Sequence, residues 1–262
     1  MVNDRLELRN KSALVTGASQ GIGLATAQRL ASYGARVALA ARRRDVVEAH
    51  AADIRDAGGE AIAIACDVSR YDEVSAAVEA TILAFGRLDI LVNNAGMIDP
   101  IARISDSDPD NWSRAVETNI KGVYHGLRAA LPVMEARGSG VIVNMSSGAA
   151  NSALEGWSHY CSTKAAAKKL TECAHREVGD RGVRVVGLSP GTVATDMMAK
   201  IRASGVNPVS RLDWSAHIPP DWVAEAVAFL CGPDGASFAG TDFSIKTDEG
   251  RQLVGLPIEN TR

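Results

Sequence analysis

Short apolar runs alternate with longer amphipathic segments along almost the whole chain of 262 residues. Strands that are apolar along their entire length are typical of a parallel sheet covered by helices on both faces, and repeated strand–helix alternation builds such a sheet. We therefore predict an α/β fold with a doubly wound parallel sheet. The expected strands are 13–15, 35–40, 61–65, 88–92, 140–145, 183–188 and 243–246, and the expected helices are 24–33, 45–57, a segment ending near 85, 112–137, 158–179 and 221–231.

No internal repeat, low-complexity tract or linker divides the chain, and 46% of its residues are hydrophobic. That content supplies a large core, so we predict a single domain over residues 1–262. Residues 192–220 carry Gly205, Pro208, Pro219 and Pro220. We expect this segment to be a mobile excursion over a cleft, in contact with the substrate.

A glycine-rich turn, Thr16-Gly17-Ala18-Ser19-Gln20-Gly21-Ile22-Gly23, connects the first apolar run to the first amphipathic segment. Between a strand and a helix, such a turn brings backbone N–H groups and the positive helix end to one point, where phosphate binds. Glycine is needed because a Cβ atom would block the approach of a pyrophosphate. The spacing is G-x-x-x-G-x-G rather than the commoner dinucleotide fingerprint. We assign the pyrophosphate site to Gly17, Ser19, Gln20, Gly21, Ile22 and Gly23.

Three arginines, Arg42 to Arg44, follow Ala41 at the end of the expected second strand and precede Asp45. In a dinucleotide-binding βαβ unit this position meets the adenosine ribose. A carboxylate there favours NAD, whereas a guanidinium suits a 2′-phosphate. Arg42 and Arg43 therefore favour NADP(H), with NAD(H) as the alternative cofactor. A solvated helix start is the alternative role of the three arginines.

Small and polar residues also follow the third and fourth strands, at the edge where ligands bind in open parallel sheets. Asp67, which precedes Val68, has two roles open to it: contact with the adenine amino group, or capping of the next helix, a role that Ser69 could also fill. Asn93 is expected to tie neighbouring strands together. We assign the cofactor site these further residues: Asp67, Val68, Asn94, Ala95 and Gly96.

Tyr160 and Lys164 lie four residues apart in a helix expected from Ser158, so they share one face. A phenol with a pKa near ~10 is a poor acid–base catalyst at neutral pH, but a nearby ammonium lowers that pKa. Such a pair also arises by chance. Ser147 precedes Tyr160 by 13 residues and ends the fifth strand. Asn119 stands in the middle of an expected helix, where asparagine is unfavourable and a buried amide needs a partner.

The charge balance excludes several classes of partner. Lys plus Arg number 28 against 31 Asp plus Glu, which leaves no field to attract nucleic acid or an acidic membrane. The four cysteines are scattered like reduced thiols, and the five histidines show no ligand spacing, so no metal site is expected. Met1 to Glu7 lacks the apolar core of a signal peptide, and no apolar run approaches the ~20 residues of a membrane span. We expect a cytoplasmic protein.

Taken in order, these signatures resemble the short-chain dehydrogenase/reductase family across nearly the whole chain. The resemblance implies a Rossmann-like sheet of about seven strands with helices on both faces. It also implies an NAD(P)-dependent enzyme that commonly forms homotetramers or homodimers, with the catalytic set Asn119, Ser147, Tyr160 and Lys164. The matching residues are Thr16-Gly17-x-x-x-Gly21-Ile22-Gly23, Asp67, Asn93-Asn94-Ala95-Gly96, Asn119, Ser147, Tyr160-x-x-x-Lys164 and Pro190-Gly191.

The resemblance extends to cofactor contacts. An arginine after the second strand goes with NADP preference in the family, and Arg42 occupies that place. A basic residue inside the glycine turn, present in some NADP-using members, is missing here. Asp248-Glu249-Gly250 departs from the family's Asp-Gly-Gly near the last strand. After the sixth strand the implied contacts are Pro190, Gly191, Val193 and Thr195, the last of them with the nicotinamide amide.

The expected reaction interconverts a carbonyl compound and a secondary alcohol, with Tyr160 as acid and base. Lys164 would lower the tyrosine pKa and bind the nicotinamide ribose, Ser147 would hold the substrate oxygen, and Asn119 would seat a water of a proton relay. Three alternatives stay open: an NAD-dependent alcohol or polyol dehydrogenase, a reductase of 3-oxoacyl thioesters, and a dinucleotide-binding regulator without turnover. The substrate is expected to be uncharged and partly apolar, since its expected lining includes Ile98, Ile101, Leu154, Trp157 and Met197.

Overall fold

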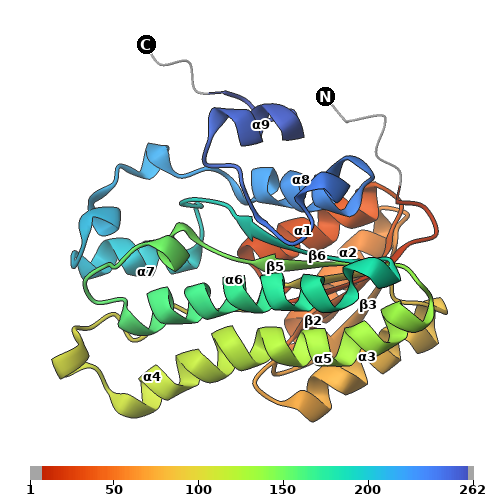
Figure 1. Ribbon diagram of the computed structural model, residues 1–262, viewed down its shortest axis with the longest axis horizontal. Helices are drawn as coiled ribbons and strands as arrows, with labels where there is room; N and C mark the ends of the chain where they lie inside the picture. Colours follow the sequence, from red (N-terminus) through yellow and green to blue (C-terminus); the bar gives the residue numbers. More distant parts are fainter. Residues whose placement is uncertain (1–7, 259–262) are drawn as a thin grey trace.

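A seven-stranded parallel sheet forms the centre of the computed structural model, which describes residues 8–258 (Figure 1). The strand order is β3-β2-β1-β4-β5-β6-β7, and every neighbouring pair is parallel. The order reverses between β1 and β4, and a crevice for ligands forms outside the carboxyl ends of strands at such a point. The strands are β1 Ser12–Thr16, β2 Arg36–Ala41, β3 Glu60–Ala65, β4 Ile90–Asn93, β5 Gly140–Met145, β6 Val183–Ser189 and β7 Asp242–Ser244.

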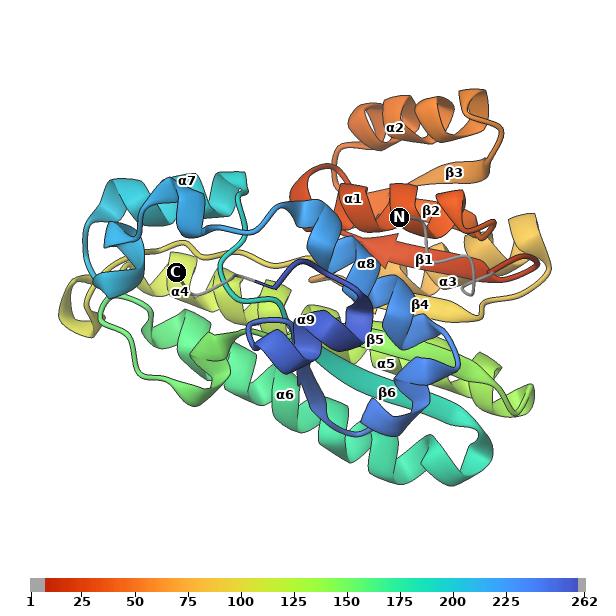
Figure 2. The same ribbon diagram turned by 90° about the horizontal axis from the view of Figure 1, so that it is seen from above.

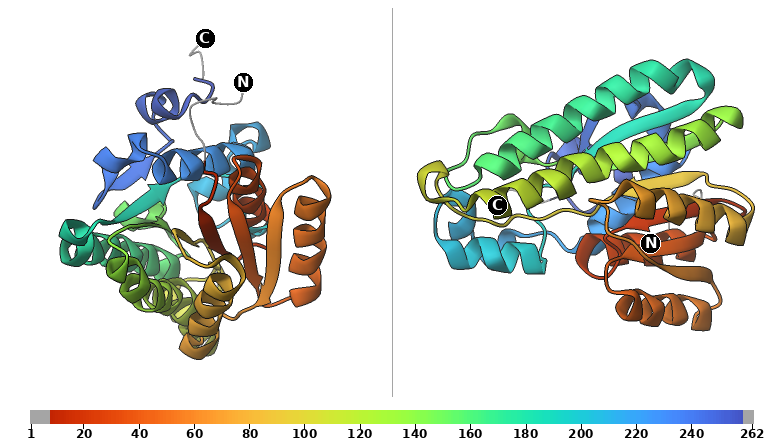
Figure 3. Two further views of the ribbon diagram at one scale, coloured as in Figure 1. Left: turned by 90° about the vertical axis from the view of Figure 1, so that its right-hand side faces the viewer. Right: turned by 90° about the horizontal axis from the view of Figure 1, so that it is seen from below.

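Helices cover both faces of the sheet, which confirms the predicted fold class (Figure 3). One core packs α1, α2 and α8 against one face, and a second core packs α3, α5 and α6 against the other. Within residues 8–258 no helix is both long and apolar enough to cross a membrane. The helices are α1 Gly21–Ser32, α2 Arg44–Asp56, α3 Tyr71–Phe85, α4 Pro109–Val116, α5 Gly122–Ala136, α6 Ser158–Val178, α7 Asp196–Ser204, α8 Pro220–Cys231 and α9 Asp248–Val254.

The central strands are buried on both faces, which explains their unbroken apolar sequences. In β1, Ala13 and Val15 contribute to the core under α1 and α8, whereas Leu14 contributes to the core under α3 and α5. Successive side chains of a strand point to opposite faces, so a strand between two helical layers needs apolar residues at every position. Met1 to Glu7, where a signal peptide was judged absent, lies outside the described residues.

The long helix predicted over residues 112–137 is interrupted by one π turn. α4 passes into α5 through η2, Glu117–Lys121, which has the wider π-helical winding. Helix α5 itself continues through Pro132. A π turn inserts one extra residue into a helix and is frequent at functional sites. Here it carries Asn119, whose side chain is 1% exposed.

The segment 192–220, expected to be a mobile excursion over a cleft, contains helix α7 and two short 3₁₀ turns, η5 Pro208–Arg211 and η6 Trp214–Ala216. The polar residues before the turns cap them: Asn207 accepts from the Val209 N–H at 3.1 Å, and Asp213 from the Ser215 N–H at 2.9 Å. Gly205 ends α7 in the left-handed region. The glycine and the prolines therefore mark ends of short elements, which lie beyond the carboxyl ends of the strands (Figure 2).

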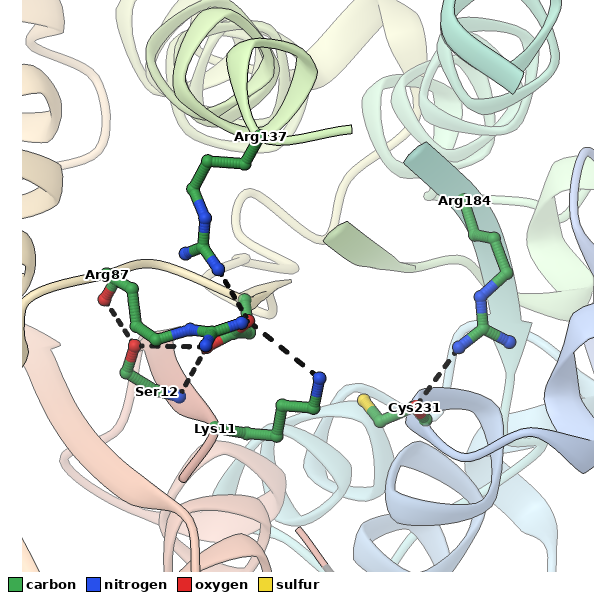
Figure 4. Close-up of polar contacts among 7 residues, drawn as sticks. Lys11, Ser12, Arg87, Arg137, Arg184 and Cys231 are labelled. Atoms are coloured by element: carbon green, nitrogen blue, oxygen red, sulfur yellow. Dashed lines mark hydrogen bonds and ion pairs between the residues drawn. The ribbon is translucent and has the colours of Figure 1, made fainter. Parts of the chain in front are cut away.

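At the amino ends of the central strands, one buried carboxylate connects several elements. Asp89, just before β4, is 4% exposed and accepts a hydrogen bond from the Ser12 N–H at 3.0 Å. Arg87 pairs with the same carboxylate, and the side-chain nitrogens of Arg137 and Lys11 lie 3.7 and 4.0 Å from its Oδ1 (Figure 4). The cluster joins the starts of β1 and β4 to the end of α5.

A second arginine contact lies on β6. Arg184 donates to the carbonyls of Cys231 at 3.1 Å and Gly232 at 2.9 Å, at the end of α8 (Figure 4). Carbonyl groups at a helix C-terminus lack partners within the helix and carry partial negative charge, so a guanidinium stabilises them. Arg184 thereby anchors α8 to the sheet.

Candidate active site

The glycine turn has no room for side chains at two of its glycines. Gly17 has φ +65°, and a Cβ atom there would lie 2.8 Å from the Cα of Ala95. A Cβ atom at Gly23 would lie 2.3 Å from the Gly17 carbonyl oxygen. The side-chain amide of Asn94 donates to the carbonyls of Thr16 at 2.9 Å and Gly17 at 3.2 Å. Asn94, predicted as a cofactor contact, therefore braces the turn through its amide.

The start of α1 is open to an anion and is flanked by other elements. Its first turn holds no acidic residue, so its N–H groups and positive dipole end suit a pyrophosphate. Thr195, at the start of α7, lies above this turn: a Cβ atom at Gly21 would be 3.3 Å from its Cγ2. From the other side, Arg43 donates to the Gln20 side chain at 3.4 Å. The tight cradle and the open helix end fit a dinucleotide.

The remaining predicted contacts of the nicotinamide half follow β6. Pro190 and Gly191 leave the strand, and Gly191 has φ +83°. Val193 is buried and forms a bridge with Ile218, which ties together the two ends of the segment that carries α7. These residues therefore lie between the sheet and α7, and their contact with a cofactor stays a prediction.

Arg42 and Arg43 follow the end of β2 and are exposed. Among the described residues, Arg42 has no hydrogen-bond or ion-pair partner, so its guanidinium is available to a ligand. Arg44 is the first residue of α2. The alternative of a helix start therefore holds for Arg44, while Arg42 and Arg43 precede the helix.

Asp67 and Val68 follow β3 without capping the next helix. The Asp67 carboxylate accepts from the N–H and hydroxyl of Ser69, at 3.0 and 2.8 Å, in a local turn. Helix α3 begins only at Tyr71, so the expectation that Asp67 or Ser69 caps it is wrong. Val68 is buried against α5, and a Cβ atom at Gly122 would be 2.8 Å from it.

The four predicted catalytic residues come from three elements that meet beyond the end of β5. Ser147 lies two residues after the strand, Tyr160 and Lys164 lie on α6, and Asn119 lies on the π turn. The Lys164 ammonium donates to the Met145 carbonyl at 2.7 Å and lies 5.7 Å from the centre of the Tyr160 ring. The helix predicted from Ser158 thus places Tyr160 and Lys164 on one face of α6.

Asn119 connects the loop after β4 to α6. Its Oδ1 accepts from the Met97 N–H at 2.9 Å, and its amide donates to the Met97 carbonyl at 2.9 Å and the Thr163 hydroxyl at 3.2 Å. A Cβ atom at Gly96 would be 3.4 Å from Asn119 Oδ1 and 3.8 Å from Lys164 Nζ, so the two side chains face one space. Both amide hydrogens are committed to protein groups, so within the side chain Oδ1 is the atom left to contact the expected relay water.

Burial decides the ionisation of the central pair. It raises the pKa of Tyr160 to about 12, and a hydrogen bond with Ser147 lowers that pKa by a smaller amount. It lowers the pKa of Lys164 to about 8, while the negative charge of Asp242 acts in the opposite direction. Desolvation favours the neutral form of both groups and dominates in the protein alone. That Lys164 lowers the tyrosine pKa stays a prediction.

An apolar wall surrounds Tyr160. It consists of the buried Ile98, Ala149, Trp157, Met198 and Ile201. The Trp157 and Tyr160 rings meet edge-on with their centres 5.5 Å apart. All five apolar residues expected to line the substrate site, Ile98, Ile101, Leu154, Trp157 and Met197, belong to or pack against this wall.

Sequence reasoning missed Met198 and Ile201, which α7 adds to the wall. Their three-residue spacing is a helical signal that the neighbouring glycine and prolines obscured. It also missed Asp242 and Ser146, whose side chains are hydrogen-bonded at 3.1 Å behind the site. Asn93 was interpreted correctly: its amide donates to Asn144 at 2.8 Å and ties β4 to β5.

The model of the short chain dehydrogenase family matches residues 11–205. The chain belongs to the short-chain dehydrogenase/reductase family. It is therefore an NAD(P)-dependent oxidoreductase, as its dehydrogenase and reductase relatives indicate. Among residues 8–258, no group of three or more His, Cys, Asp or Glu side chains gathers in a way that could hold a metal ion.

Three relatives illustrate the range of this short-chain dehydrogenase/reductase family around the chain. The 7alpha-hydroxysteroid dehydrogenase of Escherichia coli K12 is 33% identical over 244 residues, 91% of this chain and 93% of that protein. The solved structure of an NAD⁺-bound xylitol dehydrogenase has a TM-score of 0.84 and 30% identity and covers 90% of this chain and 98% of its own. A 3-ketoacyl-(acyl-carrier-protein) reductase from Brucella melitensis, complexed with NADH, has a TM-score of 0.80 and 34% identity, with coverages of 91% and 98%.

Proposed function

We propose that this enzyme interconverts an uncharged, partly apolar carbonyl compound and its secondary alcohol, with NADP(H) as the preferred cofactor and Tyr160 as acid and base. The proposal rests on one arrangement. Tyr160 lies between the Ser147 hydroxyl and the Lys164 ammonium, against an apolar wall, beyond the strand ends where the glycine cradle opens.

A nicotinamide dinucleotide, when bound, supplies or accepts the hydride. Tyr160 donates a proton to the carbonyl oxygen in reduction and accepts it from the alcohol in oxidation. The phenol is protonated at neutral pH, as proton donation in reduction requires. Ser147 donates a hydrogen bond to the same oxygen and orients it. Lys164 places positive charge beside the phenolate that forms.

Tyr160→Phe tests the assignment. Because a positioned acid–base group contributes ~10²–10⁴-fold to rate, we expect kcat for a ketone substrate to fall by about that factor. Binding of NADPH, followed by fluorescence, should stay close to that of the parent. Tyr124→Phe is the control, since Tyr124 is exposed on α5. Turnover by Tyr160→Phe at near the parental rate would contradict the role of Tyr160.

The preference for NADP(H) rests on Arg42, which is exposed at the end of β2, lacks a partner among the described residues and is followed by Arg43. The neutral Ser19 and Gln20 and the NAD-containing related structures favour the alternative. Arg42→Asp should move the ratio of kcat/KM for NADPH over NADH towards NADH, because the 2′-phosphate loses a charged partner. Arg128→Asp, at an exposed position of α5, is the control. An unchanged ratio for Arg42→Asp would refute the preference.

Reduction of 3-oxoacyl thioesters is the second candidate, which the 34% identical carrier-protein reductase supports. A carrier protein would dock on basic residues near the site, and the candidates are Arg103, Arg128, Arg137, Lys168 and Lys169. Three of these five already have an acid within ion-pair distance. Arg103 pairs with Glu155, and Lys169 pairs with Glu172. Arg137 lies near Asp89, at the amino ends of the strands and away from the site. A panel of simple ketones, aldehydes, secondary alcohols and a 3-oxoacyl thioester, followed at the nicotinamide absorbance, separates the two candidates.

The proposal includes a cytoplasmic setting and a homodimer or homotetramer. All four cysteines are free, which suits a reducing compartment. Equilibrium sedimentation tests the assembly: a mass near that of one 27.5 kDa chain would refute it.

A further inference from the structure

Asp242 reaches across a neighbouring strand towards the site. It lies on the edge strand β7 and is paired in register with Gly187 of β6. A Cβ atom at Gly187 would be 2.5 Å from Asp242 Oδ1, so the glycine leaves the space through which the carboxylate passes. Beyond β6, Oδ2 accepts a hydrogen bond from the Ser146 hydroxyl at 3.1 Å.

Ser146 connects this carboxylate to the predicted catalytic residues. It is 5% exposed, and its N–H donates to the Leu188 carbonyl at 2.8 Å, which fixes the end of β5 against β6. Ser147 follows it in the chain, and the carbonyl of the preceding Met145 accepts from the Lys164 ammonium at 2.7 Å. Asp242 thus contacts the residue that lies between Ser147 and the Met145 carbonyl bound by Lys164.

The charged groups that face Asp242 all come from one helix. Lys164, Lys168 and Glu172 follow one another at four-residue intervals on α6 and therefore share a face. Oδ1 of Asp242 is buried and has no hydrogen-bond partner among the described residues. A carboxylate with so few hydrogen bonds depends on nearby positive charge for its stability.

The coupling acts on both partners. Burial raises the pKa of Asp242, and the charges of Lys168 and Lys164 lower it. Burial lowers the pKa of Lys164, and Asp242 is the charged group that opposes this effect. Each group therefore stabilises the ionised form of the other at a site where burial favours neutral groups.

We propose that Asp242 is a positioning residue that acts through Lys164: its carboxylate, held by Ser146, keeps the Lys164 side chain in the charged ammonium form. The proposal rests on the proposed function, in which the ammonium stands beside the phenolate of Tyr160. The ammonium is lost as pH rises through the Lys164 pKa. Without the carboxylate this loss occurs at lower pH, so activity fails earlier on the alkaline side.

The first test reads Lys164 without turnover. Lysine labelled with ¹³C at Cε is incorporated, the Lys164 signal is assigned by its loss in Lys164→Arg, and its pH titration is compared between the parent and Asp242→Asn. Asparagine preserves the shape and can still accept from Ser146. We expect the pKa of Lys164 to fall by roughly half a unit to one unit, because an opposite charge is removed. An unchanged titration would overturn the proposal.

The second test is the pH profile of kcat for alcohol oxidation. The alkaline limb should move to lower pH in Asp242→Asn, by about as much as the Lys164 pKa falls. Glu172→Gln removes a neighbouring acid of α6 that pairs with Lys169; it is the control and should leave the limb in place. Asp242→Ser, which cannot crowd Gly187, is measured in the same two ways in case the asparagine variant does not fold.

The two tests separate the inference from the proposed function. A shifted lysine titration in a protein that turns over no alcohol or ketone would refute the function and support the electrostatic coupling. A parent enzyme that is active and loses activity in Asp242→Asn equally at all pH values would overturn the coupling, because a purely structural role changes kcat without moving the limb.

Discussion

Tyr160 and Lys164 have side chains 9% and 6% exposed, and both are less easily ionised than in water. The pKa of Tyr160 rises to about 12 and that of Lys164 falls to about 8, in both cases mainly because of burial. A buried lysine that stays charged at neutral pH reduces stability, since its ammonium loses hydration. Such a cost is common at active sites, where function opposes stability.

Lys164→Met should therefore stabilise the protein in a pH-dependent way. The folded pKa of about 8 lies below the ordinary 10.5, so the unfolded chain binds more protons between these values and stability rises with pH. At pH 7 the full difference of about 2.5 units corresponds to up to about 3 kcal/mol in favour of the variant, and by pH 10 it falls to roughly 1 kcal/mol. Urea unfolding at both pH values measures this.

Lys169→Met, on the exposed side of α6, should show no such pH dependence. If Lys164→Met were equally stabilising at pH 7 and pH 10, the effect would come from better packing and not from the buried charge.

At the scale of elements, the π turn η2 turns the side chain of Asn119 towards the loop after β4. The side chain replaces backbone partners for both polar groups of Met97 and contacts Thr163 on α6. The sequence predicted the helix over 112–137 and singled out Asn119. It did not predict the π turn, because a single extra residue hardly disturbs the hydrophobic period.

Asn119→Ala should weaken this junction. The N–H and carbonyl of Met97 lose their partners in a partly buried place, and an unsatisfied buried group costs about 1–3 kcal/mol. We expect the free energy of unfolding to fall by about 2 kcal/mol, measured by urea denaturation, together with a lower kcat. Thr118→Ala, the adjacent position on the same turn, is the matched control; an equal loss in both variants would argue against a specific role of the Asn119 amide.

At the scale of the whole molecule, the carboxyl ends and the amino ends of the parallel strands have different roles. The glycine cradle, Ser147 and the apolar wall lie at the carboxyl ends of the strands. The Asp89 cluster lies at their amino ends (Figure 4). There Asp89 faces the side chains of Arg87, Arg137 and Lys11. The cluster can stabilise the fold without restricting the site.

Asp89→Ala should destabilise the protein and spare its activity. Removing one partner of a buried ion pair typically costs about 3–5 kcal/mol, and the Ser12 N–H loses its acceptor as well. Thermal unfolding should therefore occur at lower temperature, while kcat and KM at 25 °C stay near parental values. Asp72→Ala, which breaks an exposed pair with Arg70, is the control and should leave the unfolding temperature near the parental value. A large loss of kcat in folded Asp89→Ala would contradict the view that the Asp89 cluster acts on stability and not on the active site.

Much of this architecture follows from local patterns. All seven predicted strands exist within a few residues of their expected ends, and the glycine turn, Ser147 and the Tyr160–Lys164 pair lie where their strands and helices put them. Apolar runs, helical spacing and turn chemistry act within about ten residues of the chain, so they can be recognised without a tertiary structure. The family resemblance rested on the order of these local features and is confirmed.

Other properties arise only when distant segments meet. Asn94 is used to brace the glycine turn, α7 packs Met198 against Tyr160, and Asp242 passes over Gly187 to Ser146. No short pattern announces such contacts, since each depends on strand register and on which residue leaves space for another. The ionisation of Tyr160 and Lys164 belongs to this group as well. Spacing along the helix brought the two side chains together, but the depth at which the completed fold buries them decided their pKa values.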